Sequence, residues 1–247
     1  MVKKGRKTAT CCVISGGEQR TMRTMFAETA RLEVRELRKE LLAGSKFLFV
    51  SSYNCLFEGM IERLISLGSE AGCAILLDLG SFEIVKRFSG RLDGLFRSVD
   101  FCVCNEDEAA AFAKIHFPVK QDTSDGSNRD NDAFDATAAW MFEHGVRSAV
   151  IVTLGERGSI LYEPSEHAQA GLRKTLQPAV RLTEGAAVDP TGAGDAFCGG
   201  LLYGLSRGMG LHEAIEMASA AGAAAVMSRG AQLSEDALSW WSKRING

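Results

Sequence analysis

The 247-residue sequence predicts an α/β fold of three layers, in which helices cover both faces of a mostly parallel sheet. Two observations support this class. Short apolar runs with the length of buried strands alternate along the chain with segments whose apolar residues recur at helical spacing. The composition, 46% hydrophobic and 24% charged residues, suffices for one substantial core. We therefore expect one large domain over residues 1–247 and not two small ones.

The first half of the chain opens with a basic terminus and a predicted hairpin, which together span residues 1–26. Residues 8–14 and 20–26 are β-prone and flank a turn with two glycines. In residues 31–42, apolar side chains recur at helical spacing among charges, so we expect a helix there. The elements predicted next are strand 46–51, helix 57–71, strand 73–79, strand 99–104 and helix 105–114.

The second half begins with a polar stretch, residues 121–132, which has almost nothing to bury and is expected to form an exposed loop. Gly155 and Gly158 then mark a turn between two short apolar runs. Three helices with apolar or alanine-rich faces are expected to close the chain. The elements predicted after the loop are helix 133–144, strand 148–154, strand 159–162, helix 195–207, helix 211–227 and helix 235–244.

Charge and composition favour a small-molecule partner. The formal net charge of -3 and the sequence pI near 5.9 give no reason to expect nucleic acid or an anionic membrane surface as a partner. No apolar run approaches the roughly 20 residues that a membrane span needs. Most of the seven cysteines lie in apolar runs, which suits the reduced thiols of an intracellular protein. We expect a cytoplasmic protein, with an organellar location left open.

The segment Thr191–Asp195, with the sequence Thr-Gly-Ala-Gly-Asp, lies where a loop becomes a helix. Small residues let the backbone N–H groups of Gly192, Ala193 and Gly194 point at one anion, and the helix dipole favours negative charge there. The segment is not a dinucleotide-binding turn, because Phe197 stands where that motif has a glycine or alanine. It is not a Walker loop either, since no Gly-Lys-Ser/Thr follows. The pattern predicts a phosphate-binding site.

Asp195 has an unusual position for a phosphate site. A carboxylate would repel a resting phosphate unless it accepts a proton from a hydroxyl that attacks beside it. We therefore expect Asp195 to act as a general base. The alternative is that Asp195 only caps the helix, as aspartate often does near a helix start. Asp189, six residues earlier, and the small residues between them make a simple cap the weaker explanation.

The string Val188–Gly200 resembles the second signature of the ribokinase, or PfkB, family of carbohydrate and nucleoside kinases. The resemblance covers nearly the whole chain and is greatest to an adenosine-kinase-like, plant-type branch. It implies a ribokinase-like fold and in-line transfer of the γ-phosphoryl group of ATP to a hydroxyl of a sugar or nucleoside. By this resemblance Asp195 takes the proton, and the amides of residues 192–194 stabilise the charge that develops.

Asn105 and Glu108, which follow a predicted buried strand, resemble the N-x-x-E motif of the same family. The resemblance places Asn105 near the phosphates and Glu108 beside a hydrated Mg²⁺, an ion that commonly keeps several of its waters. On the residues alone, an asparagine cap followed by an acidic first turn is ordinary helix design. Because the phosphate-binding segment is also present, we prefer the functional interpretation of Asn105 and Glu108.

Two further segments carry positions that the resemblance assigns to a nucleotide or a cation. Thr153, Gly155 and Gly158 match a strand and a turn that approach the nucleotide in the family. Gly194 is a further position that the resemblance assigns to the nucleotide. Residues 223–234 resemble the segment that closes over the adenine. The same resemblance implies a site for a monovalent cation such as potassium, with oxygens from Asp189, Thr191, Ala225, Ser228, Gly230 and Ser234.

Compared with the family pattern, this sequence begins late. By resemblance it lacks the N-terminal strands of the sheet and most of a β-sheet lid, which carry most substrate contacts. Arg20, Ser52 and Tyr53 are the residues expected to face the remaining substrate cavity. The alternative to a kinase is a catalytically impaired protein of this fold that binds a nucleotide or regulates another protein. Relatives often dimerise through lid strands, so a homodimer is one of the assemblies left open for this protein.

Overall fold

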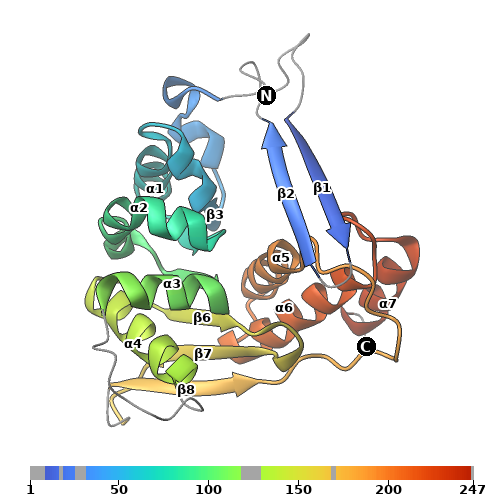
Figure 1. The fold of residues 1–247 in the computed structure, drawn as a ribbon. Helices are drawn as coiled ribbons and strands as arrows, with labels where there is room; N and C mark the ends of the chain where they lie inside the picture. The colour runs from blue at the N-terminus through green and yellow to red at the C-terminus, as the bar shows by residue number, and fades with distance from the viewer. Residues whose placement is uncertain (1–8, 17–18, 26–31, 118–128, 168–170, 246–247) are drawn as a thin grey trace.

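The computed structural model describes residues 9–16, 19–25, 32–117, 129–167 and 171–245 (Figure 1). A hairpin of two antiparallel strands, β1 (Thr10–Gly16) and β2 (Gln19–Met25), comes first. These strands lie within the segment expected to form a hairpin, and the basic residues before them lie outside the described residues. A six-stranded sheet with helices on both faces follows.

The central sheet has the strand order β3-β4-β5-β6-β7-β8, which is also the order in the chain. The first four strands are parallel, and β7 and β8 extend them as an antiparallel meander. This confirms the expected mostly parallel sheet. The strands are β3 (Phe47–Ser51), β4 (Ala74–Asp78), β5 (Phe101–Asn105), β6 (Ala149–Thr153), β7 (Ser159–Pro164) and β8 (Leu172–Gln177).

Helices cover the two faces of the sheet in separate groups (Figure 1). The chain crosses β3 to β6 in one direction, and right-handed crossovers then place α1 to α4 on one face. Helices α5 and α6 pack on the other face, and α7 packs on α6. The helices are α1 (Met60–Ala71), α2 (Phe82–Asp93), α3 (Glu106–His116), α4 (Arg129–Glu143), α5 (Ala193–Ser206), α6 (Leu211–Val226) and α7 (Glu235–Ile245).

Alternation along the strands divides the core into two apolar layers. On β4, Ile75 and Leu77 belong to the layer under α1 to α4, whereas Leu76 belongs to the layer under α5 and α6. On β6, Val150 and Ile151 divide in the same way. All five side chains are fully buried. The three-layer architecture expected from the sequence is therefore confirmed.

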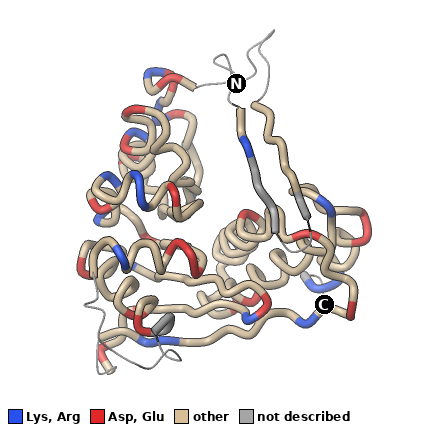
Figure 2. The backbone as a smooth tube through the Cα atoms, in the orientation of Figure 1, with Lys and Arg blue, Asp and Glu red and all other residues tan. Residues whose placement is uncertain are grey.

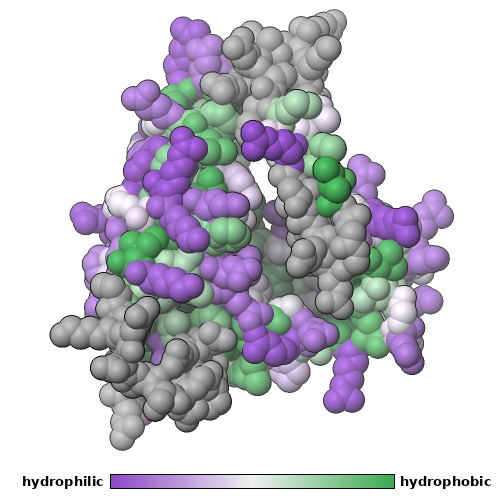
Figure 3. Space-filling model, in the orientation of Figure 1, coloured by the Kyte–Doolittle hydropathy of each residue, from purple (hydrophilic) through white to green (hydrophobic). Residues whose placement is uncertain are grey.

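The outer surface carries charges of both signs. Figure 2 shows lysine and arginine interspersed with aspartate and glutamate over the helices. Figure 3 shows a mostly hydrophilic surface over α1 and α2, with scattered apolar residues. All seven cysteines are free, and five of them are buried. Of the helices that the structure describes, none combines the length and the apolar character needed to cross a bilayer.

The helix predicted for residues 31–42 is wrong. The described part of this segment forms two short 3₁₀ helices, η2 (Val34–Glu36) and η3 (Lys39–Leu42). Leu32 and Leu41 are 47% and 57% exposed, while Leu37 is buried. A regular helix would need a surface for its whole apolar stripe. The small apolar cluster that this segment shares with α1 takes in only part of that stripe.

Two other differences concern the borders and number of elements. Residues 121–128 of the expected loop lie outside the described residues, but α4 begins at Arg129, so the last four residues of that stretch are helical. Helix α2 was not predicted, and it contains a residue with a non-helical backbone conformation, Phe88. Strand β8 was not predicted either. It is an edge strand without a buried residue, and its sequence, Leu-Arg-Lys-Thr-Leu-Gln, contains no apolar run.

Close contact between α5 and α6 fixes the direction of α5. A Cβ atom at Gly200 would lie 2.8 Å from Cα of Ala218 and 2.7 Å from Cβ of Ala221. A Cβ atom at Gly204 would lie 2.9 Å from Cα of Ala214. These distances leave no room for a side chain, so the two helices pack closely along their backbones. Helix α5 is thereby a rigid support for the segment at its N-terminus.

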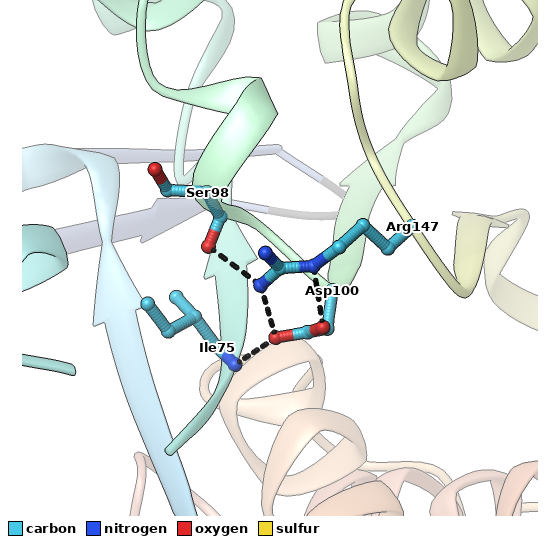
Figure 4. Close-up of polar contacts among 4 residues, drawn as sticks. All are labelled: Ile75, Ser98, Asp100 and Arg147. Atoms are coloured by element: carbon cyan, nitrogen blue, oxygen red, sulfur yellow. Dashed lines mark hydrogen bonds and ion pairs between the residues drawn. The ribbon is translucent and has the colours of Figure 1, made fainter. Parts of the chain in front are cut away.

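An ion-pair network joins the amino-terminal ends of β4, β5 and β6 (Figure 4). Arg147 donates from Nε to Oδ1 of Asp100 at 2.8 Å and from Nη2 to Oδ2 at 2.9 Å. The same Nη2 donates to the carbonyl oxygen of Ser98 at 3.1 Å. Asp100 also accepts the backbone N–H of Ile75 at 2.7 Å. Asp100 is therefore the central acceptor of the network.

We expect Asp100→Ala to lower the free energy of unfolding by about 2–3 kcal/mol, because the Ile75 N–H and the Arg147 guanidinium both lose their acceptor. Arg147→Ala should cost only about 1 kcal/mol, since the Arg147 side chain is half exposed. Urea denaturation followed by circular dichroism measures both values. Equal losses in the two variants would contradict the central position of Asp100.

Candidate active site

Polar residues end the four parallel strands at one edge of the sheet. Ser51, Asp78, Asn105 and Thr153 are the last residues of β3, β4, β5 and β6. The register pairs Ser51 with Asp78 and Asn105 with Thr153. Asp78, Asn105 and Thr153 each follow by two residues a member of the apolar layer under α5 and α6. Ser51 follows another member of that layer, Phe47, by four residues and so lies on the same face. The four residues therefore line the carboxyl edge on the α5 side, where open α/β sheets bind their ligands.

The N-terminus of α5 carries the predicted phosphate-binding segment. Gly192 is the N-cap and has a φ of 81°, a left-handed conformation that favours glycine. The N–H of Ala193 donates to the carbonyl oxygen of Pro190 at 3.2 Å. No described residue accepts the N–H groups of Gly194 and Asp195, which are therefore available to an anion. The anion site at residues 192–194 stays a prediction, to which the structure adds the amide of Asp195.

Gly194 and Asp195 are exposed residues of the first turn of α5. A Cβ atom at Gly194 would meet no atom within 4 Å, so the fold does not require glycine there. No hydrogen bond or ion pair joins the Asp195 carboxylate to any residue that the structure describes. The N-cap is Gly192, so the structure does not support Asp195 as a simple cap. A carboxylate with the freedom to take a proton thus stands beside N–H groups that can bind phosphate.

Asp78 is a site residue that the sequence analysis missed. It ends the apolar strand β4 and accepts a hydrogen bond from the backbone of Gly80. Burial, with a further contribution from the negative charge of Asp195, raises the pKa of Asp78 to about 6. The available signal was an acidic residue directly after an apolar run, at the end of a strand that precedes a crossover. Asp78 brings a second carboxylate to the N-terminus of α5.

Asn105 and Glu108 form a reciprocal capping box at the start of α3. Oδ1 of Asn105 accepts the N–H of Glu108 at 2.9 Å, and Oε2 of Glu108 accepts the N–H of Asn105 at 2.9 Å. The side-chain amide of Asn105 also donates to Oε1 of Glu108 at 2.8 Å. Glu108 is only 3% exposed. Burial raises its pKa to about 7, and the charges of Asp78 and Asp107 add to that rise.

The carboxylates at this edge fit a hydrated metal ion better than a directly bound one. In the part of the chain that the structure describes, no group of three or more His, Cys, Asp or Glu side chains could hold a metal ion. Asp78 and Glu108 are nevertheless poorly solvated acids whose charged forms are disfavoured. A nearby divalent cation would stabilise those charged forms. Mg²⁺ commonly keeps several waters, which fits contact through its hydration shell.

The stability of the metal-free protein should fall as the pH rises from about 4 to 7. The folded pKa values of Asp78 and Glu108, about 6 and about 7, lie above the ordinary 3.8 and 4.5. Within that window the folded state binds more protons than the unfolded state, so each rise in pH favours unfolding. Melting temperatures in EDTA should show this decrease, and the decrease should be smaller in Glu108→Gln. The same pH dependence in both proteins would contradict the raised pKa of Glu108.

The turn from β6 to β7 carries Thr153, Gly155 and Gly158. The hydroxyl of Thr153 donates to the carbonyl oxygen of Cys104 at 3.4 Å. Gly158 has a φ of 95°, and a Cβ atom there would lie 2.0 Å from the carbonyl oxygen of Gln177. Gly155 has a φ of 57°, and a Cβ atom there would meet nothing within 4 Å. The backbone conformation therefore explains glycine at both positions, and at Gly158 the close approach of Gln177 adds to it.

Asp189 connects the loop before α5 to the segment after α6. Its Oδ1 accepts the N–H and the hydroxyl of Thr191 at 2.9 and 2.6 Å. Its Oδ2 accepts the N–H of Gly230 at 2.9 Å. Asp189, Thr191 and Gly230, three of the residues assigned to the monovalent cation, are thus brought together. The same bonds hold the phosphate-binding segment in place.

The other residues assigned to the cation lie in the turn that follows α6. Oγ of Ser228 lies 3.1 Å from Oγ of Ser234 and accepts the Ser234 N–H at 2.8 Å. The N–H of Ser228 donates to the carbonyl oxygen of Ala225 at 3.0 Å. Gly230 lies between the two serines and links this turn to Asp189. The six assigned residues therefore belong to one connected region, and their role with a cation stays a prediction.

The three residues expected to face the substrate occupy different surroundings. Ser52 is fully buried, and its hydroxyl donates to the carbonyl oxygen of Leu79. Tyr53 is 43% exposed, and its ring lies against Gly80, whose φ is 70°. Arg20 lies in β2, but its side chain lies outside the described residues. Of the two side chains that the structure describes, Tyr53 is the exposed one, and its role toward a substrate stays a prediction.

Comparison with protein-family models decides the family. The model described as pfkB family carbohydrate kinase matches residues 1–238. The chain belongs to the pfkB family. Its similarity to pfkB relatives extends along most of the chain: the adenosine kinase of Schizophyllum commune is 28% identical over 229 residues, which are 87% of this chain and 62% of that protein.

Solved structures of similar proteins confirm the ribokinase-like α/β fold of this pfkB protein. A probable sugar kinase from Rhizobium etli CFN 42 has a TM-score of 0.76 at 22% identity. The match covers 97% of this chain and 66% of the Rhizobium etli chain. Anopheles gambiae adenosine kinase, in complex with P1,P4-di(adenosine-5) tetraphosphate, has a TM-score of 0.74 at 24% identity. The match covers 92% of this chain and 65% of the Anopheles gambiae chain. The chain thus spans about two thirds of the length of these relatives or less.

Proposed function

We propose that this pfkB protein carries the ATP site and the proton acceptor of a kinase that moves the γ-phosphoryl group of ATP to a hydroxyl of a nucleoside or sugar. The observation that carries the proposal is the first turn of α5. There the Asp195 carboxylate, which no described residue binds, stands beside the N–H groups of Gly194 and Asp195, which no described residue accepts. One helical turn therefore supplies both a base and an anion site.

The proposed reaction follows from these groups. The acceptor oxygen attacks the γ-phosphorus, its O–H bond breaks, and Asp195 takes the proton. The bond from the γ-phosphorus to the bridging oxygen breaks, and ADP leaves. The N–H groups and dipole at the start of α5 stabilise the charge on the transferring group. Bound Mg²⁺ would neutralise phosphate charge, with Glu108 holding it through its waters and Asn105 near the phosphates.

A monovalent cation such as potassium is proposed to support the same loop. The carboxylate of Asp189 already joins Thr191 to Gly230. A cation beside this carboxylate and the oxygens of Ala225, Ser228 and Ser234 would stiffen the connection further. Its effect on the reaction would be indirect, because it would fix the position of the N–H groups and would not contact the phosphate.

Adenosine or a closely related nucleoside is the acceptor that we propose. An adenosine kinase matches 87% of the chain, and one solved neighbour is an adenosine kinase in complex with a molecule that contains two adenosines and four phosphates. Tyr53 adds a physical reason. Its exposed ring, held against Gly80, offers an aromatic face on which a base can stack.

A screen of acceptor-dependent ATP consumption tests the proposed function. ADP formation is measured with Mg²⁺ and ATP in the presence of adenosine, inosine, ribose or fructose, and without an acceptor as the control. We expect adenosine to stimulate ADP formation most. If the folded protein binds ATP but no acceptor raises ADP formation above the control, the kinase proposal fails. The alternative, a protein of this fold that binds nucleotide without transfer, would then be preferred.

A further inference from the structure

Two turns meet at the carboxyl ends of β3 and β4. The first is η4 (Ser52–Leu56), a 3₁₀ helix that carries Tyr53, and the second leads from β4 into α2. The carbonyl oxygen of Leu79 joins them, because it accepts both the Ser52 hydroxyl and the Ser81 N–H, the latter at 2.8 Å. Ser52 is fully buried, so its bond is shielded from water. The two turns are therefore fixed relative to each other.

The Tyr53 ring lies against the backbone of Gly80 in the second turn. A Cβ atom at Gly80 would lie 3.0 Å from Cδ2 and 3.1 Å from Cε2 of Tyr53, and 3.0 Å from Oγ of Ser52. The φ of Gly80 is 70°, in the left-handed region that favours glycine. Glycine therefore suits both the backbone of this turn and the place of the ring. Tyr53 remains 43% exposed, so part of its side chain is open to a ligand.

Hydrogen bonds on both sides of Tyr53 hold the backbone that carries the ring. The N–H of Tyr53 donates to Oγ of Ser51 at 3.4 Å, and the side-chain amide of Asn54 donates to the carbonyl oxygen of Ser51 at 2.8 Å. Arg91 of α2 donates from Nη1 to the carbonyl oxygen of Cys55 at 2.7 Å. The ring is therefore ordered before a ligand binds. Such a ring loses less conformational entropy when a ligand stacks on it.

We propose that Gly80 and Ser52 are positioning residues, which fix the Tyr53 ring as a stacking surface for the base of a nucleoside acceptor. Gly80 leaves the space that the ring occupies. Ser52 holds Leu79, and with it the backbone on which the ring rests. Ser52, which was expected to face the substrate, then acts through Tyr53 and not by contact. The inference rests on the proposed function and deepens it.

Adenosine binding to the full chain, measured by isothermal titration calorimetry, tests the stacking surface without phosphoryl transfer. Tyr53→Ala should raise the Kd of adenosine about tenfold, within the range found when a base loses its aromatic partner. Phe82→Ala is the matched control, since Phe82 is 39% exposed and begins α2 two residues after Gly80. Its Kd should stay close to that of the unchanged protein. An unchanged Kd in Tyr53→Ala, or equal increases in the two variants, would overturn the inference.

Gly80→Ala tests the positioning role. The added methyl group would displace the ring, so the Kd of adenosine should rise several-fold although Tyr53 itself is unchanged. In the double variant Gly80→Ala/Tyr53→Ala, the Kd should be no higher than in Tyr53→Ala, because the ring through which Gly80 acts is gone. A merely structural role of Gly80 would add its full effect to that of Tyr53→Ala. Additive effects of the two substitutions would therefore refute the positioning role.

Ser52→Ala keeps the test decisive if Gly80→Ala does not fold. It removes a single hydroxyl, and the carbonyl oxygen of Leu79 still accepts the Ser81 N–H, so we expect this variant to fold. Circular dichroism checks that it does. The Kd of adenosine should rise by a smaller factor than in Tyr53→Ala, and only while Tyr53 is present. The same increase in the Tyr53→Ala background would contradict a role that passes through the ring.

The outcomes distinguish failure of this inference from failure of the proposed function. If no acceptor is phosphorylated but Gly80→Ala and Tyr53→Ala weaken adenosine binding without adding, the stacking surface is real and the transfer reaction is refuted. If adenosine is phosphorylated and the two effects add, the proposed function stands and the inference about Gly80 and Ser52 is refuted alone. If another acceptor is phosphorylated and adenosine does not bind, the inference is again refuted alone.

Discussion

Asp195→Asn is expected to lower the kcat of ATP-dependent phosphorylation by about 10²–10⁴-fold, the usual contribution of a positioned general base. Asparagine has the size of aspartate but cannot take the proton of the acceptor hydroxyl. No described residue binds the Asp195 carboxylate, so the melting temperature should not fall. The affinity for ATP should stay the same or rise, because a negative charge beside the phosphates has been removed.

Steady-state kinetics with adenosine and ATP measure this effect, with Asp107→Asn as the matched control. Both variants remove one exposed acid from the first turn of a helix at the same edge of the sheet. We expect the kcat of Asp107→Asn to remain close to that of the unchanged protein. If Asp195→Asn and Asp107→Asn had equal kcat values, Asp195 would not be the proton acceptor.

Gly194→Ala is the second change for which we expect a large effect. The new methyl group would enter the space in front of the Gly194 and Asp195 N–H groups, where no atom lies within 4 Å of a Cβ position. A phosphoryl group would then lose its approach to these donors. We expect kcat/KM for ATP to fall by about 10²–10³-fold, the size of effect found when an oxyanion donor is lost.

Gly199→Ala is the matched control for Gly194→Ala. Gly199 is exposed on the same helix, and a Cβ atom there would also meet no atom within 4 Å. Neither variant should be less stable than the unchanged protein, because alanine is favoured over glycine in a helix by up to about 1 kcal/mol. Only Gly194→Ala should lose activity. Equal kinetics in the two variants would show that the space at Gly194 does not receive the phosphoryl group.

The parts of the fold that were predictable are those specified by local patterns. The apolar runs at β3, β4, β5 and β6 are short and bounded by helical periodicity, so each indicates a buried parallel strand. The segment around Gly192–Asp195 combines small residues with a helix start, which indicates an anion site without any distant contact. The spacing of Asn105 and Glu108 indicated a helix start, whereas their functional interpretation came from the resemblance to the N-x-x-E motif and from the phosphate-binding segment.

The parts that were not predictable depend on contacts between distant segments. Residues 31–42 have helical periodicity but find only a small apolar surface on α1, so 3₁₀ helices form instead. The glycine requirement at Gly158 arises from the backbone of Gln177. Asp78 has only a weak local signature, an acidic residue directly after an apolar run, and the rise of its pKa depends on burial by other segments of the fold. The hydrogen bond of the buried Ser52 likewise depends on a distant residue, Leu79, which directly follows β4.

The central claim is that the N-terminus of α5 receives the γ-phosphate of ATP. The backbone amide signals of Gly194 and Asp195 in ¹⁵N-labelled protein test it most directly, in titrations with Mg²⁺ and either a non-hydrolysable ATP analogue or ADP. We expect both signals to shift with the ATP analogue and much less with ADP, which lacks the γ-phosphate. Binding of the analogue without a shift of these two signals, or equal shifts with ADP, would contradict the claim.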